Sequence, residues 1–330
     1  MGGKISTLVL TERLFRRGLK ELPRSKREEL ENLASVRFQS PKDLERKDLK
    51  EVESLVGFPS QIEDRFLDWG KDLRWIHLLS AGVDGLMRRR IKESDLLLTN
   101  SSGVHGKQIA EHVFAFILSF NRNLPRFVIN QRKKRWERGE EEEMREVYGK
   151  TLGVLGFGAI GERVVEVGKG LGMKALATKR RLKEGKRVEN KVTLYDSGRT
   201  GELLRRSDYL VVALPLTKRT AGALGLEEFE AMKETAFFVN IGRGELVRER
   251  ELVEALRRKE IAGAGLDVFE EEPLPEESPL WEMENVIITP HNAGMTPHYG
   301  ERALDLFLED LARYAAGEEL LNIVDKEEEY

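Results

Sequence analysis

Short apolar runs alternate with charged segments through the first hundred residues of the chain. The runs lie at residues 8–10, 54–56, 75–79 and 96–99, and the segments between them suit helices with one solvent-facing side. Runs of this length, separated by helix-compatible stretches, are typical of the strands of a mostly parallel sheet. The pattern predicts a small α/β unit at the N-terminus.

A longer segment with a different period follows. The apolar residues between positions 106 and 120 recur at helical spacing: Ile109, Val113, Phe116, Ile117 and Phe120. This spacing predicts one long helix that carries the chain out of the first unit, and we place a domain crossing near residue 102. Residues 132–145 hold six basic and five acidic side chains, a balance that favours a solvated helix and loop over a nucleic-acid interface.

The apolar runs in the second half of the chain contain few polar residues. They lie at residues 151–155, 173–178, 209–214, 236–240, 263–268 and 286–289, with helix-compatible segments between them. Continuous apolar runs are typical of parallel strands that helices cover on both faces. A length of 330 residues allows about two domains. We therefore expect an α/β protein whose second half forms a doubly wound sheet.

The composition removes several classes of function. The chain has 55 basic and 58 acidic residues, a net charge of -3, so no overall charge attracts nucleic acid or an anionic membrane. It has no cysteine, which excludes disulfides, iron–sulfur clusters, thiolate zinc sites and cysteine nucleophiles. Its longest apolar runs, such as residues 113–118, are far shorter than the ~20 residues of a membrane-spanning helix. We expect a soluble, cytoplasmic protein without a metal site.

The strongest motif follows the apolar run at 151–155. Gly156, Gly158 and Gly161 form the pattern Gly-x-Gly-x-x-Gly, with a helix-compatible segment after it. The first glycine permits a tight turn, the second lets the backbone approach a pyrophosphate, and the third lets helix and strand pack closely. The free amides at the start of the helix attract the anion. The strand before the glycines and the helix after them predict a dinucleotide site, with ordinary turn glycines as the alternative.

The residues after the run at 173–178 bear on the choice of dinucleotide. An NAD site needs an acid there for the ribose hydroxyls, but no acid occurs between positions 166 and 184. Cations and a hydroxyl suit a 2′-phosphate, and the chain has both here: Thr178, Lys179, Arg180 and Arg181. The sequence therefore predicts a preference for NADP(H), with NAD as a second cofactor. The alternative is a solvated basic turn.

Polar residues gather at the later apolar runs, near the edge where ligands bind in such sheets. They are Arg243, Asp267 within the run at 263–268, the acids at 270–272, and His291. An arginine, an acid and a histidine at one sheet edge can converge on the reacting end of a cofactor. Arg243 has the alternative of a structural ion pair, although the glycines on both sides keep the backbone close to a ligand.

Four motifs in this order resemble the signatures of the D-isomer-specific 2-hydroxyacid dehydrogenases. They are the glycine motif at 153–161, Asn-Ile-Gly-Arg-Gly-Glu-Leu-Val at 240–247, Gly-Leu-Asp-Val-Phe-Glu-Glu-Glu-Pro-Leu-Pro at 265–275, and Thr-Pro-His at 289–291. Residues 79–84 and 99–105 are similar to the family's substrate loop and domain crossing. The resemblance covers nearly the whole chain, and the order and separation of the motifs make it specific.

The resemblance implies two doubly wound domains. A Rossmann dinucleotide-binding domain, residues 103–292, would be inserted into a flavodoxin-like substrate-binding domain, residues 1–102 and 293–330. It also implies a homodimer. The long helix at 106–120 suits a dimer interface, although a helix buried within one subunit gives the same pattern.

The resemblance further implies catalytic roles for Arg243, Glu272 and His291. Arg243 would hold the carboxylate and carbonyl oxygen of a 2-keto acid, and protonated His291 would give its proton to the alkoxide that forms. Glu272 would orient the imidazole and favour its charged form. Glu270 and Glu271 compete for this role, but the family's acid directly precedes the Pro-Leu pair, which selects Glu272.

Ligand contacts follow from the same resemblance. The substrate would be bound by Ser80, Ala81 and Gly82 together with Arg243 and His291. The cofactor would be bound by Gly156, Gly158, Ala159, Ile160, Gly161, Thr178, Lys179, Arg180, Pro215, Thr220, Ile241, Gly242, Asp267 and Gly294, with Asp267 on the nicotinamide carboxamide.

The implied activity is reduction of a small 2-keto acid such as glyoxylate or hydroxypyruvate to the D-2-hydroxy acid. Two alternatives remain. One is a phosphoglycerate dehydrogenase-like enzyme, which usually prefers NAD. The other is a dimeric scaffold that senses the dinucleotide without essential chemistry, as the corepressors that share these motifs do. No nucleic-acid or membrane partner is expected.

Overall fold

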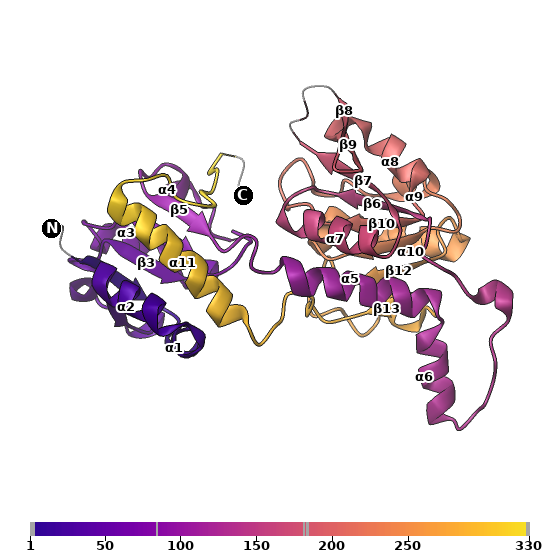
Figure 1. Cartoon of the computed structure of the whole chain (residues 1–330), viewed down its shortest axis with the longest axis horizontal. Helices are drawn as coiled ribbons and strands as arrows, with labels where there is room; N and C mark the ends of the chain where they lie inside the picture. The colour runs from indigo at the N-terminus through magenta and orange to yellow at the C-terminus, as the bar shows by residue number, and fades with distance from the viewer. Residues whose placement is uncertain (1–3, 84, 181, 183–184, 328–330) are drawn as a thin grey trace. The chain divides into compact units, whose positions relative to one another are not determined.

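The computed structural model describes residues 4–83, 85–180, 182 and 185–327, so Asp84 and Arg181 of the motifs above lie outside the described residues. The chain divides into two compact units (Figure 1). Unit 1 contains residues 1–105 and 296–330, and unit 2 contains residues 106–295. Both crossings between the units lie three residues later than the sequence places them.

Unit 1 is built on a five-stranded parallel sheet with the order β2-β1-β3-β4-β5, which is the order of flavodoxin-like folds. Its strands are β1 (Ile5–Val9), β2 (Ala34–Phe38), β3 (Ser54–Gly57), β4 (Trp75–Leu78) and β5 (Leu97–Asn100). Its α-helices are α1 (Glu12–Glu21), α2 (Arg24–Leu33), α3 (Asp64–Trp69), α4 (Arg89–Lys92) and α11 (Tyr299–Ala316).

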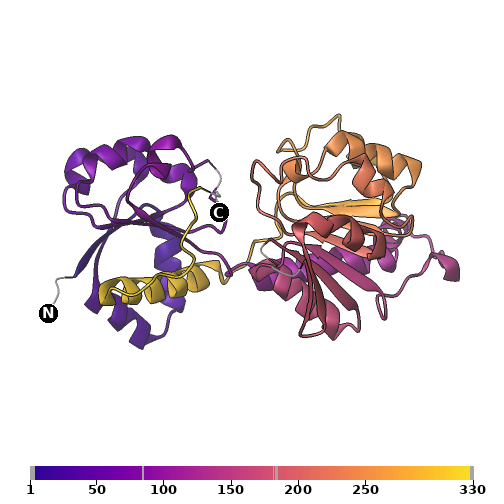
Figure 2. The same cartoon turned by 90° about the horizontal axis from the view of Figure 1, so that it is seen from above.

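Helices cover both faces of this sheet (Figure 2). On one face, Val9 packs in a cluster with Phe15 of α1 and Phe307 of α11. On the other face, Leu8 packs in a cluster that includes Phe66 of α3. Neighbouring strand residues such as Leu8 and Val9 point to opposite faces, so a continuous apolar run fills both cores.

Unit 2 is built on an eight-stranded sheet with the order β13-β12-β11-β10-β6-β7-β9-β8. Its strands are β6 (Thr151–Leu155), β7 (Lys174–Lys179), β8 (Lys186–Glu189), β9 (Val192–Asp196), β10 (Tyr209–Val212), β11 (Phe237–Asn240), β12 (Gly263–Leu266) and β13 (Val286–Ile288). Only the β8–β9 pair is antiparallel among these strands. The parallel order around β6 is that of a Rossmann fold.

Helices also cover both faces of the second sheet. They are α5 (Gly106–Asn121), α6 (Leu124–Arg132), α7 (Ala159–Gly170), α8 (Thr200–Arg206), α9 (Leu226–Glu230) and α10 (Glu249–Arg258). Val113 of α5 and Val164 of α7 belong to one core cluster. Leu203 of α8, Phe229 of α9 and Leu252 of α10 belong to the other.

The prediction of two doubly wound α/β domains is confirmed, and α5 lies where the helical spacing placed it. The sequence did not predict β2, β8 or β9. β8 has the sequence Lys-Arg-Val-Glu and all four residues are exposed, so it carries no hydrophobic signal. It pairs with β9 as the last strand of the sheet.

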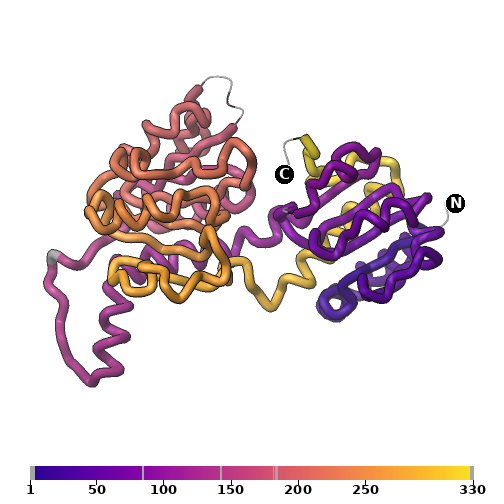
Figure 3. Tube along the Cα trace, turned by 180° about the vertical axis from the view of Figure 1, so that it is seen from behind, coloured from indigo at the N-terminus to yellow at the C-terminus, as the bar shows by residue number. Residues whose placement is uncertain are grey.

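Helix α6 and the residues after it extend away from the sheet of unit 2 (Figures 1 and 3). Residues 131–138 are exposed, in agreement with the solvated helix and loop that the charge balance predicts. Leu124, Val128 and Ile129 of α6 are also exposed, and so is Trp136 in the segment that follows. Within the described residues, no helix combines the length and the apolar character that a membrane crossing requires.

Candidate active site

The candidate active site lies at one edge of the unit 2 sheet. β11, β12 and β13 are neighbours in parallel register, so their carboxyl ends lie side by side. Arg243 comes shortly after β11, and residues 289–291 follow β13. The sequence placed Asp267 within the run at 263–268. In the structure β12 ends at Leu266, so Asp267 is the first residue after the strand. The topology therefore gathers the predicted arginine, acid and histidine at one edge.

His291 and Glu272 form a direct pair. His291 Nδ1 lies 2.8 Å from Glu272 Oε2, and the other carboxylate oxygen accepts a bond from the amide of Phe269 at 3.1 Å. The two side chains are 50% and 36% exposed, so the pair is open to an incoming ligand. His291 Nε2 makes no hydrogen bond to any described residue. The second ring nitrogen is therefore free to meet a substrate oxygen.

The neighbouring acid Glu270 is engaged elsewhere. Its carboxylate accepts a bond from the amide of Glu249 at 3.0 Å, and its own amide donates to the Glu249 carboxylate at 3.1 Å. Burial, with the nearby charges of Glu270 and Glu271, raises the pKa of Glu249 above its ordinary value. Of the three consecutive acids, Glu272 is the one in contact with His291.

Arg243 lies in a tight turn that Asn240 shapes. The Asn240 side chain accepts from the amide of Gly242 at 3.1 Å and donates to the carbonyl of Arg243 at 3.0 Å. The half-buried Arg243 guanidinium donates to the carbonyl of Gly242 at 2.8 Å. A Cβ at Gly244 would lie 1.8 Å from the carbonyl carbon of Phe269. Glycine there lets the Arg243 turn approach the segment that carries Glu272.

Asp267 is 1% exposed and holds the segment after β13. Its Oδ1 accepts from Thr289 Oγ1 at 2.6 Å and from the amide of Asn292 at 2.8 Å, and its Oδ2 accepts from the amide of Ala293 at 2.9 Å. A carboxylate offers about four acceptor positions. The structure thus gives Asp267 a role in holding this loop, which the sequence did not predict.

The glycine motif forms the turn between β6 and α7. Gly156 has φ +98°, and a Cβ there would lie 2.5 Å from the carbonyl oxygen of Ala213. A Cβ at Gly161 would lie 2.0 Å from the carbonyl oxygen of Gly156, whereas one at Gly158 would meet nothing within 4 Å. α7 begins at Ala159, so the amides of Ala159, Ile160 and Gly161 belong to its first turn, which leaves amides unpaired. These residues fit a pyrophosphate.

Thr178 and Lys179 lie beside this turn. The Thr178 hydroxyl accepts from the amide of Gly156 at 3.0 Å, and its carbonyl accepts from the amide of Phe157 at 2.9 Å. The Lys179 ammonium lies 6.0 Å from the centre of the Phe157 ring. Lys179 and Arg180 are exposed, while Thr178 is buried. The basic residues therefore lie next to the glycine motif. The contacts of Thr178 stabilise the turn of that motif.

The remaining predicted cofactor residues lie in loops at the same sheet edge. Pro215 and Thr220 belong to the loop after β10, where Thr220 Oγ1 donates to the Pro215 carbonyl at 2.7 Å. Ile241 and Gly242 follow β11. The Gly294 carbonyl accepts from Gln108 Nε2 of α5 at 3.1 Å.

The predicted substrate loop belongs to unit 1, where it follows β4. Ser80 Oγ donates to the carbonyl of Gly82 at 2.6 Å, and Asn100 Nδ2 donates to the carbonyl of Ala81 at 2.8 Å. These bonds fix the loop within unit 1.

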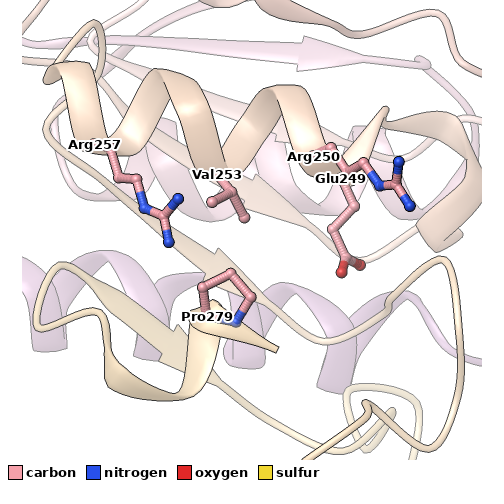
Figure 4. Close-up of a pocket in the computed structure, with 5 residues that line it drawn as sticks. All are labelled: Glu249, Arg250, Val253, Arg257 and Pro279. Carbon is pink, nitrogen blue, oxygen red and sulfur yellow. The ribbon is translucent and has the colours of Figure 1, made fainter. Parts of the chain in front are cut away.

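A pocket elsewhere on unit 2 does not contain the predicted residues. It lies along α10 and is lined by Glu249, Arg250, Val253, Arg257 and Pro279 (Figure 4). Neither Arg243 nor His291 lines it, so it is not the candidate active site.

Sequence reasoning missed four polar residues that hold the site together. They are Gln108 and His112 on α5, Asn240 and Thr289. The one available signal was that Gln108 and His112 interrupt the apolar pattern of a long helix, one turn apart.

Comparisons with known proteins agree with this geometry. The family described as "D-isomer specific 2-hydroxyacid dehydrogenase, NAD binding domain" matches residues 114–293. The glyoxylate reductase of Aeropyrum pernix is 36% identical over 278 residues, 81% of each chain. The crystal structure of a D-isomer specific 2-hydroxyacid dehydrogenase from Xanthobacter autotrophicus Py2, in complex with NADPH and MES, is 28% identical with a TM-score of 0.83, over 99% of this chain and 100% of that chain.

A longer relative is also similar. The D-3-phosphoglycerate dehydrogenase of Methanocaldococcus jannaschii is 32% identical over 259 residues, which cover 78% of this chain and 49% of that protein. The chain thus spans about half of that relative's length.

The family match and the A. pernix relative show that the chain belongs to the D-isomer specific 2-hydroxyacid dehydrogenases, a family of oxidoreductases. It has their two-domain fold, with a Rossmann domain and a substrate-binding domain.

Proposed function

We propose that this chain reduces a small 2-keto acid, of the size of glyoxylate or hydroxypyruvate, to the D-2-hydroxy acid. The observation that carries the proposal is the His291–Glu272 pair, 2.8 Å apart, at the sheet edge that also holds the Arg243 turn. The similarity to a glyoxylate reductase supports the choice of substrate. The nicotinamide cofactor, when bound, supplies the hydride for the carbonyl carbon.

The side chains account for the rest of the reaction. Negative charge develops on the carbonyl oxygen, and His291 donates its Nε2 proton to that oxygen. Glu272, bound at Nδ1, keeps the ring oriented and offsets the positive charge that the imidazole carries before the transfer. Arg243 binds the carboxylate and the carbonyl oxygen by charge-assisted hydrogen bonds. Ser80, Ala81 and Gly82 of unit 1 are assigned to the substrate carboxylate.

We assign the dinucleotide to unit 2 and infer a preference for NADP(H). The pyrophosphate would bind the amides of Ala159, Ile160 and Gly161, and Lys179 and Arg180 would bind the 2′-phosphate. An acid does lie nearby, because Asp196 pairs with Lys179 in the β7–β9 register, but its carboxylate accepts a bond from the amide of Gly198. The NADPH complex of the X. autotrophicus relative supports this assignment.

A panel of 2-keto acids, assayed with NADPH and with NADH, tests the proposal. Glyoxylate and hydroxypyruvate should be reduced, and NADPH should be preferred about 10–100-fold in kcat/KM, the scale of one or two charge-assisted bonds. Oxidation of D-3-phosphoglycerate with NAD, without reduction of the smaller acids, would favour the phosphoglycerate dehydrogenase alternative. Dinucleotide binding without turnover of any acid would favour the scaffold.

We also propose that the chain forms a homodimer. Leu124, Val128 and Ile129 on α6 are 47%, 47% and 50% exposed, and Trp136 is 98% exposed. Leu124 and Val128 lie one turn apart on α6, and exposed apolar side chains on one helix face often mark a protein interface. Light scattering should give twice the chain mass of 37.7 kDa at micromolar concentration, and a monomeric mass would contradict the proposal.

A further inference from the structure

Helix α5 holds both ends of the loop that carries His291. Its His112 Nε2 lies 2.9 Å from Thr289 Oγ1, and its Gln108 Nε2 donates to the carbonyl of Gly294 at 3.1 Å. Gln108 and His112 are four residues apart, so they lie on one face of the helix. The loop at 289–294 is thus fixed to α5 on both sides of His291.

The direction of the hydrogen bonds follows from chemistry. Thr289 Oγ1 lies 2.6 Å from Asp267 Oδ1, and a carboxylate only accepts, so the hydroxyl must donate its single proton to Asp267. The hydroxyl can then only accept from His112. His112 must therefore carry a proton on Nε2, and the chain runs from His112 through Thr289 to Asp267.

Asp267 connects this hydrogen-bond chain to the backbone around His291. Its carboxylate accepts from the amides of Asn292 and Ala293, and its main-chain carbonyl accepts from the amide of His291 at 2.8 Å. His291 has φ +54°, a left-handed conformation that non-glycine residues rarely adopt. The backbone of His291 keeps this conformation because the bonds on each side of it are made.

We propose that His112 is a positioning residue for His291, acting through Thr289 and Asp267. The role of His291 as proton donor rests on the proposed function, whereas the hydrogen-bond chain does not. Small displacements of a catalytic group cost up to about 100-fold in rate. We expect loss of the His112 donor to lower kcat about 10-fold, with little change in KM or in the dissociation constant of NADPH.

The bond direction is tested without any activity measurement. The chain has five histidines, so the imidazole nitrogens of a protein with ¹⁵N-labelled histidine can be assigned by single substitutions. His112 should be protonated at Nε2, and Thr289→Val should shift its ring-nitrogen resonances while Thr289→Ser leaves them near the wild-type positions. A His112 ring protonated only at Nδ1 would overturn the proposal.

The effect on His291 is tested by a matched pair of substitutions. The His112 ring contacts the Phe116 ring, with 4.7 Å between the ring centres. His112→Leu fills the same space beside Phe116 but has no hydrogen-bond donor. His112→Gln places an amide N–H near the position of the histidine Nε2. In His112→Leu the His291 resonances should shift and kcat should fall, while His298 stays unchanged. His112→Gln should restore both.

Two results would contradict the positioning role. One is a His112→Leu variant with unchanged His291 resonances and wild-type kcat, and the other is a His112→Gln variant as impaired as His112→Leu at equal thermal stability. If the wild-type protein reduces no 2-keto acid, the proposed function fails. The resonances of His112 and His291 then still decide whether the positioning chain exists.

Discussion

Asp310 of α11 is a fully buried carboxyl group, and its replacement by asparagine should stabilise unit 1 at neutral pH. Its Oδ1 accepts a bond from the amide of Leu321, but its Oδ2 makes no hydrogen bond to any described residue. Oδ2 lies 3.8 Å from Nδ1 of the buried His77, too far for a hydrogen bond. Burial lowers the pKa of His77 to about 3, so this ring is neutral and gives the carboxylate no compensating charge.

The size of the effect follows from the pKa of Asp310. Burial raises this pKa from 3.8 to about 6, although the Leu321 amide acts in the opposite direction. The folded protein then binds the proton more tightly than the unfolded chain, so Asp310 destabilises the fold above pH 6 and this cost disappears below pH 4. A shift of about two pKa units corresponds to up to about 3 kcal/mol. Asp310→Asn should recover most of this at pH 7.

Urea unfolding of the wild-type protein and of Asp310→Asn between pH 4 and pH 8 measures the effect. The difference in unfolding free energy between the two proteins should be greatest at pH 7 to 8. It should shrink towards pH 4, because Asp310 then becomes protonated in both the folded and the unfolded state. The contributions of the other titrating groups are the same in both proteins and cancel in this difference. Glu31→Gln, at an exposed acid on α2 of the same unit, is the control and should show no such trend. A difference between wild type and Asp310→Asn that does not vary with pH would refute the reasoning.

Three further predictions concern unit 2. Lys179→Asp should remove or reverse the preference for NADPH over NADH in kcat/KM, because the new carboxylate repels a 2′-phosphate and accepts from ribose hydroxyls; an unchanged ratio would show that the basic turn binds no phosphate. Glu272→Gln should lower kcat less than loss of His291 does and should move the alkaline limit of the pH–rate profile to lower pH; an unchanged profile would point to another acid. Gly161→Ala should lower the melting temperature, because its Cβ would lie 2.0 Å from a carbonyl oxygen, whereas Gly158→Ala should fold normally and bind NADPH more weakly.

The fold was predictable where burial leaves a hydrophobic signal. β10 and β11 are buried at every position, and their continuous apolar runs predicted them. β8 is exposed at every position, so nothing in its sequence distinguishes it from a charged loop. Edge strands of this kind depend on the pairing partner that tertiary structure supplies.

The site was predictable only as far as local motifs reach. His291 and Glu272 were assigned from short motifs at the ends of strands, and they lie in contact. His112 was passed over because the polar positions of this helix, Gln108 and His112 among them, do not reveal which residues they contact. Its partner Thr289 is 177 residues away, and only the packing of α5 against the sheet brings them together. Contacts between such distant residues leave no periodicity in the sequence.

The most direct test of the central claim compares the reduction of glyoxylate by NADPH in the wild-type protein and in His291→Ala. The rate is measured from the loss of absorbance of the reduced nicotinamide. A matched control is His298→Ala, which removes another exposed histidine, in unit 1. If His291 donates the proton, kcat should fall by roughly 10²–10⁴ in His291→Ala while the dissociation constant of NADPH stays within severalfold and the control keeps wild-type turnover. Near wild-type turnover in His291→Ala would contradict the account.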